Sequence, residues 1–500
     1  MTVESASEDR IQTATSLADH DRVPILEGIH HYHELGIVPF STPGHKLGAG
    51  ADPELVATYG EATFRSDIPL GGGVGDTHFS GHALDQAEAL AADAWGAERS
   101  YFLLNGSSAG NHAVLLAAIR PGDTVIVSRD LHKSLMVALI LSGANPVYIA
   151  PELHPTQQVG LGISAAQIAD ALDRHPETRL IALVSPSYCG VPSDLAGIAR
   201  VAHEHGVPVH VDEAWGPQFH FHPALPPSAM ASGVDTAVMS THKVLGSFTQ
   251  AAVLHQQGRL IDGDRLRTTV GMVQTTSPSV SILASIDATR RQMALQGESL
   301  LERTISLAVQ ARERLQAIPG VSVLDGPGLG LESIDLTKLV VDVNGLGITG
   351  YEAEHRLRHS YGVGPEMSDL VALMFLITIG DTQASIDHLV AGFEGLATEN
   401  TTASAYTSIM RSSGAPVAPA TLVMTPHEAF FAPAHAIALA DSVGAVSAEL
   451  VIPYPPGIPV LAPGEVITAE KVEYLREGAS QGMYLSGPAD SSLSTIRIVS

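Results

Sequence analysis

Short apolar runs alternate with helical segments through the middle of this chain. Seven runs of four or five mostly apolar residues predict buried strands. Continuous apolar strands that alternate with helices form parallel sheets covered on both faces, so we expect an α/β fold with a mostly parallel seven-stranded sheet. The predicted strands are Tyr101–Leu104, Thr124–Val127, Val147–Ala150, Leu180–Val184, Val207–Val211, Thr236–Met239 and Ala251–Leu254.

Helical spacing of apolar residues indicates the connecting helices and the parts that follow the sheet. A long helix over 293–316 leads into a smaller α+β unit, and residues 424–450 predict one or two helices. The helices expected between the strands are Ala83–Trp95, Asn111–Ile119, Lys133–Ser142, Ser164–Arg174 and Leu195–His205. The predicted organisation is an N-terminal arm (1–65), a large domain (66–310), a small α+β domain (311–400) and a C-terminal extension with a Pro-rich segment (401–500).

Composition excludes several classes of partner. The 27 Lys and Arg stand against 53 Asp and Glu, a net charge of −26, which offers no electrostatic footprint for nucleic acid. No run of 18 apolar residues predicts a membrane span, and the polar N-terminus shows no signal segment. The single cysteine, Cys189, excludes an internal disulfide and fits a reducing compartment, so we expect a cytoplasmic protein.

Chemically reactive residues follow the ends of several predicted strands. Lys243 closes the stretch Ser240-Thr241-His242-Lys243, Asp212 follows a second strand, and His132 follows a third. Ligands of parallel sheets bind beyond the carboxyl ends of the strands, so these side chains should converge. Taken alone, Lys243 is most simply a surface lysine in a turn between strands. Asp212 is most simply an acceptor of a capping hydrogen bond, and His132 a histidine whose hydrogen bonds are made within the fold.

Together these groups match pyridoxal 5'-phosphate (PLP). Lys243 supplies an amine for an imine, Asp212 a carboxylate for a protonated pyridine nitrogen, and His132 a ring that stacks on the cofactor. The small and hydroxyl residues of 105–110 lie at a predicted helix start, where free N–H groups favour a phosphate. On local sequence alone, Ser107 or Ser108 more simply caps that helix.

At this point the sequence resembles the Orn/Lys/Arg decarboxylase family, which belongs to the fold type I, aspartate-aminotransferase-like PLP enzymes. It is similar to the shorter members that lack an N-terminal wing domain. The matching stretches are STPGHKLG (41–48), NGSSAGN (105–111), DLHKS (130–134), VDEAWG (211–216), STHKVLGSFTQ (240–250), QTTSPS (274–279), YGVGPEMSDL (361–370), ITIGDT (377–382) and IPYPPGIPVLAPGE (452–465).

The resemblance implies roles for particular residues. Lys243 would be the Schiff-base lysine, Asp212 the partner of the ring nitrogen and His132 the stacking residue. Homodimers, or multiples of dimers, with active sites at the interface are expected, and Thr276 would reach the neighbouring subunit's phosphate. The other cofactor-binding residues would be Ser107, Ser108, Ala109, Ala214, Ser240 and His242. Candidate groups for a cationic substrate are Asp76, Glu213, Glu366 and Tyr454.

The implied reaction is decarboxylation of ornithine, lysine or arginine to the amine and CO2, as in polyamine biosynthesis. The same scaffold could run another PLP reaction on a basic amino acid, as an oxidase, aminotransferase, racemase or lyase, or persist as a non-catalytic homologue. The Gly-rich context of Val74–His78 departs from the family pattern and leaves the substrate open. No metal site is expected, because the histidine pairs His203/His205 and His220/His222 have a spacing that does not share a helix face.

Overall fold

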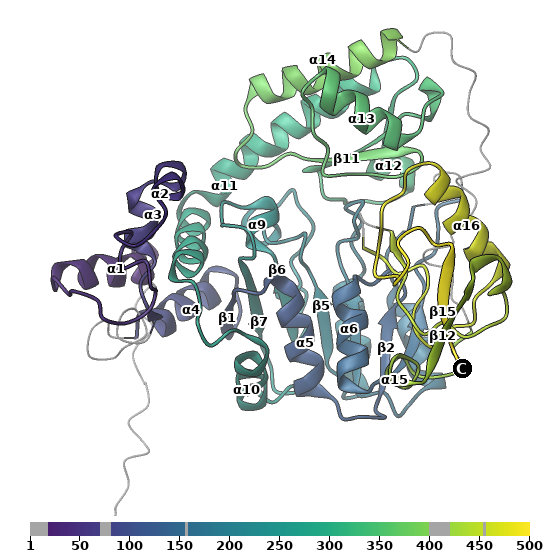
Figure 1. Cartoon of the computed structure of the whole chain (residues 1–500), viewed down its shortest axis with the longest axis horizontal. Coiled ribbons are helices and arrows are strands. Elements are labelled where there is room, and N and C mark those ends of the chain that lie inside the picture. Colours follow the sequence, from purple (N-terminus) through teal and green to yellow (C-terminus); the bar gives the residue numbers. More distant parts are fainter. Residues whose placement is uncertain (1–18, 71–81, 156–158, 400–420, 454–456) are drawn as a thin grey trace, which may run out of the picture.

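A seven-stranded sheet forms the centre of the computed structural model, which describes residues 19–70, 82–155, 159–399, 421–453 and 457–500 (Figure 1). Its strand order is β1-β7-β6-β5-β4-β2-β3, and β7 runs in the direction opposite to the other six strands. All seven predicted strands are present, with ends shifted by at most two residues. They are β1 (Arg99–Leu103), β2 (Thr124–Ser128), β3 (Asn145–Ile149), β4 (Leu180–Val184), β5 (Val209–Asp212), β6 (Thr236–Met239) and β7 (Ala252–Gln256).

Helices cover both faces of this sheet, and one of them begins earlier than predicted. α5 starts at Gly106 instead of Asn111, because the small residues that read as a loop form its first turn. Gly110 permits this close approach: a Cβ there would lie 2.5 Å from Cγ2 of Val238 on β6. The connecting helices are α4 (Ala83–Ala94), α5 (Gly106–Ala118), α6 (Lys133–Ser142), α7 (Ala165–Arg174), α8 (Leu195–Glu204) and α10 (Gly263–Val273).

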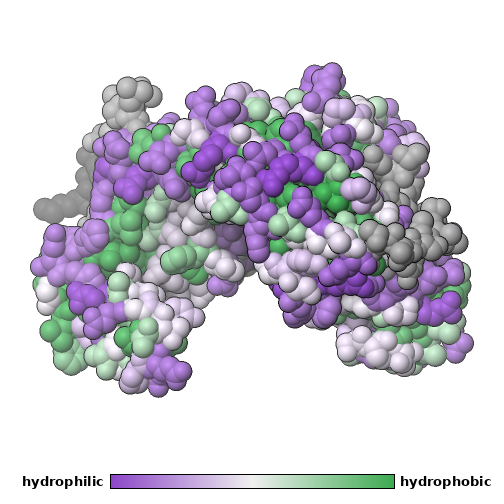
Figure 2. Space-filling view, turned by 90° about the horizontal axis from the view of Figure 1, so that it is seen from above, coloured by the Kyte–Doolittle hydropathy of each residue, from purple (hydrophilic) through white to green (hydrophobic). Residues whose placement is uncertain are grey.

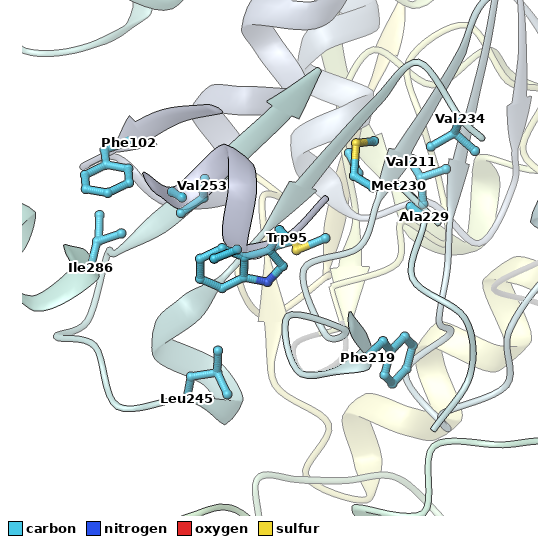
Figure 3. Packing of buried hydrophobic residues seen from close by; sticks show 14 of the residues in the cluster. Trp95, Phe102, Val211, Phe219, Ala229, Met230, Val234, Leu245, Val253 and Ile286 are labelled. Atoms are coloured by element: carbon cyan, nitrogen blue, oxygen red, sulfur yellow. The ribbon is translucent and has the colours of Figure 1, made fainter. Parts of the chain in front are cut away.

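Alternate residues of most strands pack into two hydrophobic clusters, one on each face. In β4, Ile181 and Leu183 enter the first cluster, whereas Leu180 and Ala182 enter the second. Figure 3 shows part of the first cluster, in which the fully buried Trp95 lies among the labelled side chains. The buried runs therefore predicted the strands correctly, because each central strand is covered on both faces.

The long helix α11 (Val280–Gln316) leads from the large sheet to a smaller antiparallel one. The small sheet has the order β10-β11-β9-β8 and its own hydrophobic cluster. This unit lies over the edge of the large sheet at which the short helix α9 (Thr241–Val244) is found (Figure 1). Its elements are β8 (Ser322–Val323), α12 (Gly326–Leu329), β9 (Lys338–Asp342), α13 (Gly350–Ser360), β10 (Met367–Ser368), β11 (Ala372–Leu376) and α14 (Gln383–Glu399).

The two ends of the chain flank the large sheet (Figure 1). The prediction of helices over 424–450 is only partly correct, because a single short α-helix is followed by a strand whose partner is at the C-terminal end. Among the described residues, no helix has the length and apolar character that crossing a bilayer requires. The flanking elements are α1 (Pro24–Glu34), α2 (Pro53–Tyr59), α3 (Glu61–Ser66), α15 (Pro426–Phe431), β12 (Ala434–Ala438), β13 (Ile452–Pro453), α16 (Ala469–Ser480), β14 (Leu485–Ser486) and β15 (Thr495–Val499).

The predicted domain boundaries at residues 65, 310 and 400 stay predictions. The last of these boundaries adjoins residues 400–420, which lie outside the described residues.

A buried ion network attaches the C-terminal segment to the large sheet. Arg129, directly after β2, contacts both carboxylate oxygens of Glu465, with Nε to Oε1 at 2.9 Å and Nη2 to Oε2 at 3.1 Å. Lys471 Nζ donates to Oε2 of the same carboxylate at 3.0 Å. Burial acts to raise the pKa of Glu465, but the charges of Arg129 and Lys471 hold it below its usual value. Glu465 is therefore an anion held between two buried cations.

Replacing Glu465→Gln should lower the free energy of unfolding by about 3–5 kcal/mol, because two cations would remain buried without their counter-charge. Urea denaturation measures this loss. The matched control is Glu204→Gln in the exposed Arg200–Glu204 pair, which should change the stability by less than about 1 kcal/mol. Equal effects of the two substitutions would contradict this account of the network.

Candidate active site

Lys243 lies on α9, directly beyond the carboxyl end of β6. Its half-buried side chain places Nζ 4.0 Å from the ring centroid of Trp215, which follows the neighbouring strand β5. Burial lowers the pKa of Lys243, and the negative charges of Asp212 and Glu366 oppose that shift. The ends of the neighbouring strands β5 and β6 therefore surround the Lys243 amine. Because its pKa is lowered, a larger fraction of this amine is in the neutral, nucleophilic form.

Asp212 is the last residue of β5 and is buried, with 3% of its surface exposed. Its Oδ2 accepts a hydrogen bond from Nδ2 of Asn111 at 2.7 Å, and Oδ1 accepts one from the backbone N–H of Ala214 at 3.2 Å. Burial raises the pKa of Asp212, whereas the Lys243 charge and the Asn111 hydrogen bond act in the opposite direction. Both oxygens are consequently held in place while the group can still ionise.

Behind Asp212, a chain of buried hydrogen bonds fixes Asn111. His210 Nε2 lies 2.8 Å from Asn111 Oδ1, and His210 Nδ1 lies 3.0 Å from Thr236 Oγ1. Burial lowers the pKa of His210 to about 3, so the imidazole is neutral at physiological pH. The amide of Asn111 donates to Asp212, so its oxygen must accept, and His210 therefore carries its proton on Nε2.

The same asparagine also reaches His132. Asn111 Nδ2 donates to Ser134 Oγ at 2.8 Å, and that hydroxyl lies 2.8 Å from His132 Nδ1. The backbone N–H of Ser134 also donates to Nδ1 at 3.2 Å, so His132 caps α6 and carries its own proton on Nε2. Burial, followed by the charge of Lys243, lowers the pKa of His132 to about 3. Asn111 thus links the buried carboxylate to a neutral imidazole.

The first turn of α5 lies beside these groups. Ser240 Oγ donates to Ser107 Oγ at 3.1 Å, which joins the end of β6 to this turn. Ser107 and Ser108 stand inside the helix, and the N-cap residue is Asn105, whose side chain bonds the carbonyl oxygen of Val273 and not the helix, so the capping interpretation of the two serines is wrong. The backbone N–H groups of this turn are free to bind an anion, and the small residues there, including Ala109, let an anion come close.

His242 is the exception among the expected phosphate ligands. Its Nδ1 lies 2.8 Å from the carbonyl oxygen of Ala251, so Nδ1 is the protonated nitrogen. Burial, with the nearby Lys243 charge, lowers the pKa of His242. Because a neutral ring protonated on Nδ1 has no proton on Nε2, His242 donates to a phosphate only when it takes up a second proton.

Other predicted residues lie away from this cluster or outside the described residues. Glu213 is buried, and its Oε1 accepts from the N–H of Ala229 at 2.9 Å, whereas its Oε2 has no hydrogen-bond partner among the described residues. Thr276 is exposed, and Glu366 is exposed but acts electrostatically on Lys243. Asp76 and Tyr454 fall outside the described residues.

Four residues of the site were missed by sequence reasoning: Asn111, His210, Trp215 and Lys338. His210 carried a usable signal, because it precedes Asp212 by two positions in a buried strand and so shares its face of the sheet. Trp215 stands within the matching stretch VDEAWG but was given no role. Asn111 ends the matching stretch NGSSAGN and was likewise given no role. Lys338, whose Nζ lies 4.7 Å from the ring centroid of Trp215, carried no local signal, since its partners are far away along the chain.

The arrangement fits PLP. Asp212 offers a buried carboxylate for a pyridine nitrogen, and Lys243 an enclosed amine for an aldehyde. The small side chain of Ala214, whose N–H binds Asp212, leaves space above the strand end for a flat ring. The uncapped first turn of α5 suits the phosphate.

Comparisons with known proteins agree with this site. Residues 23–326 match the family model for the Orn/Lys/Arg decarboxylase major domain, and residues 408–484 match that for the C-terminal domain. The chain is 37% identical to the arginine decarboxylases of Halalkalibacterium halodurans and Bacillus subtilis, over 97% of this chain and 99% of each relative. The crystal structure of the Francisella novicida lysine decarboxylase superposes with a TM-score of 0.80 at 21% identity, covering 95% of this chain and 81% of that one.

The predicted aspartate-aminotransferase-like fold of type I is confirmed by this likeness and by the sheet order. The cofactor prediction is likewise confirmed by the family match. The chain therefore belongs to the Orn/Lys/Arg decarboxylase family and is a PLP-dependent amino-acid decarboxylase.

Proposed function

We propose that this enzyme decarboxylates arginine in preference to lysine and ornithine, releasing CO2 and the corresponding amine. The observation that carries the proposal is the meeting of Lys243, Asp212 and His132 at one sheet edge, in a chain whose near full-length relatives are named arginine decarboxylases. The expected cytoplasmic location and role in polyamine biosynthesis are parts of this proposal.

Each residue of the cluster has a distinct task. Lys243 would hold the cofactor through its amine, Asp212 would keep the ring nitrogen protonated, and His132 would pack on the ring. When bound, PLP supplies a pyridinium that accepts the electron pair left on Cα as CO2 departs. Ser107, Ser108, Ala109, Ser240 and His242 would bind the phosphate, and Ala214 would leave room for the ring.

The proton that replaces the lost carboxylate comes from Lys243 in this proposal. His132 is the other candidate, but burial lowers its pKa to about 3, so its imidazole is neutral at pH 7. Burial lowers the pKa of Lys243 towards the working range, where proton transfer is most efficient. His132 therefore acts as a neutral packing and hydrogen-bonding group.

Glu366 is the best supported of the groups proposed to bind the cationic end of the substrate. It directly precedes β10, is exposed, and its negative charge acts on both Lys243 and Lys338. A carboxylate in this place can bind a guanidinium through two parallel hydrogen bonds. Asp76 and Tyr454 are also proposed to bind the cationic end of the substrate. Glu213 is less suited to this role, because its Oε1 is bound to the N–H of Ala229 in the core.

A homodimer is part of the same proposal. Figure 2 shows a hollow between two lobes of the molecule, and a groove of about 620 Å³ lies between α1, α3 and α11. Phe40 is 96% exposed, and Phe248, which lines the groove, is 58% exposed. Large apolar side chains in the open favour a protein interface. Thr276, also exposed, would reach the partner's phosphate across it.

A substrate screen tests the proposed reaction directly. Holoenzyme supplied with arginine, lysine or ornithine should release CO2 and the matching amine in equal amounts, with kcat/KM for arginine at least about ten-fold above the others. Keto acid or peroxide in place of CO2 would indicate another PLP reaction. Absence of CO2 from all three amino acids would rule the proposal out.

Lys243→Ala should abolish covalent attachment of the cofactor and lower kcat by at least about 10²–10⁴-fold. Borohydride reduction followed by peptide mapping should locate the cofactor on Lys243 in the wild-type protein and nowhere in the variant. Lys46→Ala is the matched control and should keep the label on Lys243. A label on another lysine of the wild-type protein would refute the assignment.

The buried His210 predicts a specific pH dependence of stability. Its folded pKa of about 3 lies below the unfolded value of about 6.5, so its contribution is complete above pH 6.5 and is lost as the pH falls. Between pH 7.5 and 5, the stability deficit of His210→Gln relative to wild type should shrink by about 2 kcal/mol. Urea denaturation at both pH values measures this, with the exposed His435→Gln as control. An unchanged deficit would show that His210 is not held neutral.

A further inference from the structure

A second buried lysine meets Lys243 at the same indole ring. Lys338 is the first residue of β9 in the small sheet and is 1% exposed. Its Nζ lies 4.7 Å from the ring centroid of Trp215, and Nζ of Lys243 lies 4.0 Å from that centroid. The two amines are thus within about 9 Å of each other, although Lys243 lies on α9 beyond the large sheet and Lys338 lies in the small one.

Lys338 makes no direct ion pair with the described residues, although the charges of Asp335 and Glu366 act on it from further away. An ammonium has three donors, and Nζ of Lys338 makes one hydrogen bond, to the carbonyl oxygen of Ser187 at 3.1 Å. No carboxylate of the described residues lies within 4.0 Å of it. The nearby Asp335 is engaged elsewhere, by Thr337 Oγ1 at 2.6 Å and Gln218 Nε2 at 3.2 Å. A buried cation without an ion pair is costly, and an anionic ligand would offset that cost.

The protonation state agrees with this position. Burial lowers the pKa of Lys338 to about 8, and the Lys243 charge acts in the same direction, while Asp335 opposes both. At pH 7 the side chain is therefore still mostly an ammonium.

We propose that Lys338 binds the α-carboxylate of the amino-acid substrate, an inference that rests on the proposed function. The reaction brings two anions into the site: the cofactor phosphate, which the first turn of α5 suits, and the substrate carboxylate, which has no other assigned partner. Ser187 follows β4 at the carboxyl edge of the sheet, so its hydrogen bond holds Lys338 at this edge, near Lys243. Glu366 would meet the opposite, cationic end of the same substrate.

This contact would exist only before the reaction. When the bond between Cα and the carboxylate carbon breaks, its electron pair stays on Cα and CO2 leaves without charge. Lys338 then loses its anion, and the product amine is no longer held at that end. Because the contact stabilises the bound substrate, its removal should raise KM much more than it lowers kcat.

The test compares substrate with product in Lys338→Met and Lys338→Gln. The methionine variant keeps the length and apolar stem, and the glutamine variant keeps a donor for Ser187. In Lys338→Met, KM for arginine should rise about ten-fold to a hundred-fold, while the inhibition constant of the product amine changes less than about two-fold. Lys338→Gln should show a smaller rise in KM with the same insensitivity to the amine.

Equal weakening of amino acid and amine, or no change in either, would overturn the inference. If the methionine variant fails to fold, the glutamine variant answers the question, and wild-type enzyme should bind argininamide, which lacks the carboxylate, at least ten-fold more weakly than arginine. If wild-type protein releases no CO2, the proposed function fails separately. Calorimetric dissociation constants for amino acid and amine then still decide whether Lys338 recognises the carboxylate.

Discussion

The hydrogen bond from Asn111 to Asp212 is the interaction on which the rest of this site depends. A carboxylate buried at a strand end is unfavourable unless its oxygens are satisfied, and here Asn111 and the N–H of Ala214 satisfy them at 2.7 and 3.2 Å. Asn111 can do this only because His210 fixes its oxygen. Through Ser134 the same amide also orients His132. The Asn111 side chain thus positions both Asp212, expected at the ring nitrogen of the cofactor, and His132, expected on the face of the ring.

Two parts of the chain outside the large sheet complete the arrangement. The C-terminal segment contacts the loop that carries His132, because Arg129 is bound to Glu465 and the N–H of Lys133 donates to the carbonyl of Gly457 at 3.0 Å. The small sheet contributes Lys338, which meets Trp215 and Ser187 from the other side. The active site is therefore an interface between units, and its geometry depends on how firmly each unit is attached.

Sequence reasoning located the strands and the residues at their ends because both follow from local rules. Apolar runs buried on two faces are read directly from the chain, and parallel strands bring Lys243, Asp212 and His132 to one edge. The start of α5 was misplaced because Gly and Ser read as loop formers, although packing on β6 holds them in a helix. The roles of Asn111 and Lys338 could not be deduced from local spacing, since their partners Asp212 and Ser187 lie 101 and 151 residues away.

The most direct test of this account is the ¹⁵N NMR signal of the pyridine nitrogen in holoenzyme prepared with ¹⁵N-labelled PLP. If Asp212, held by Asn111, keeps that nitrogen protonated, the wild-type protein will give the signal of a pyridinium at pH 8. Asp212→Ala will give that of an unprotonated pyridine, and Asn111→Ala will give an intermediate response with a changed pH dependence. A protonated nitrogen in all three proteins, or an unprotonated one in the wild type, would contradict the central role of this carboxylate.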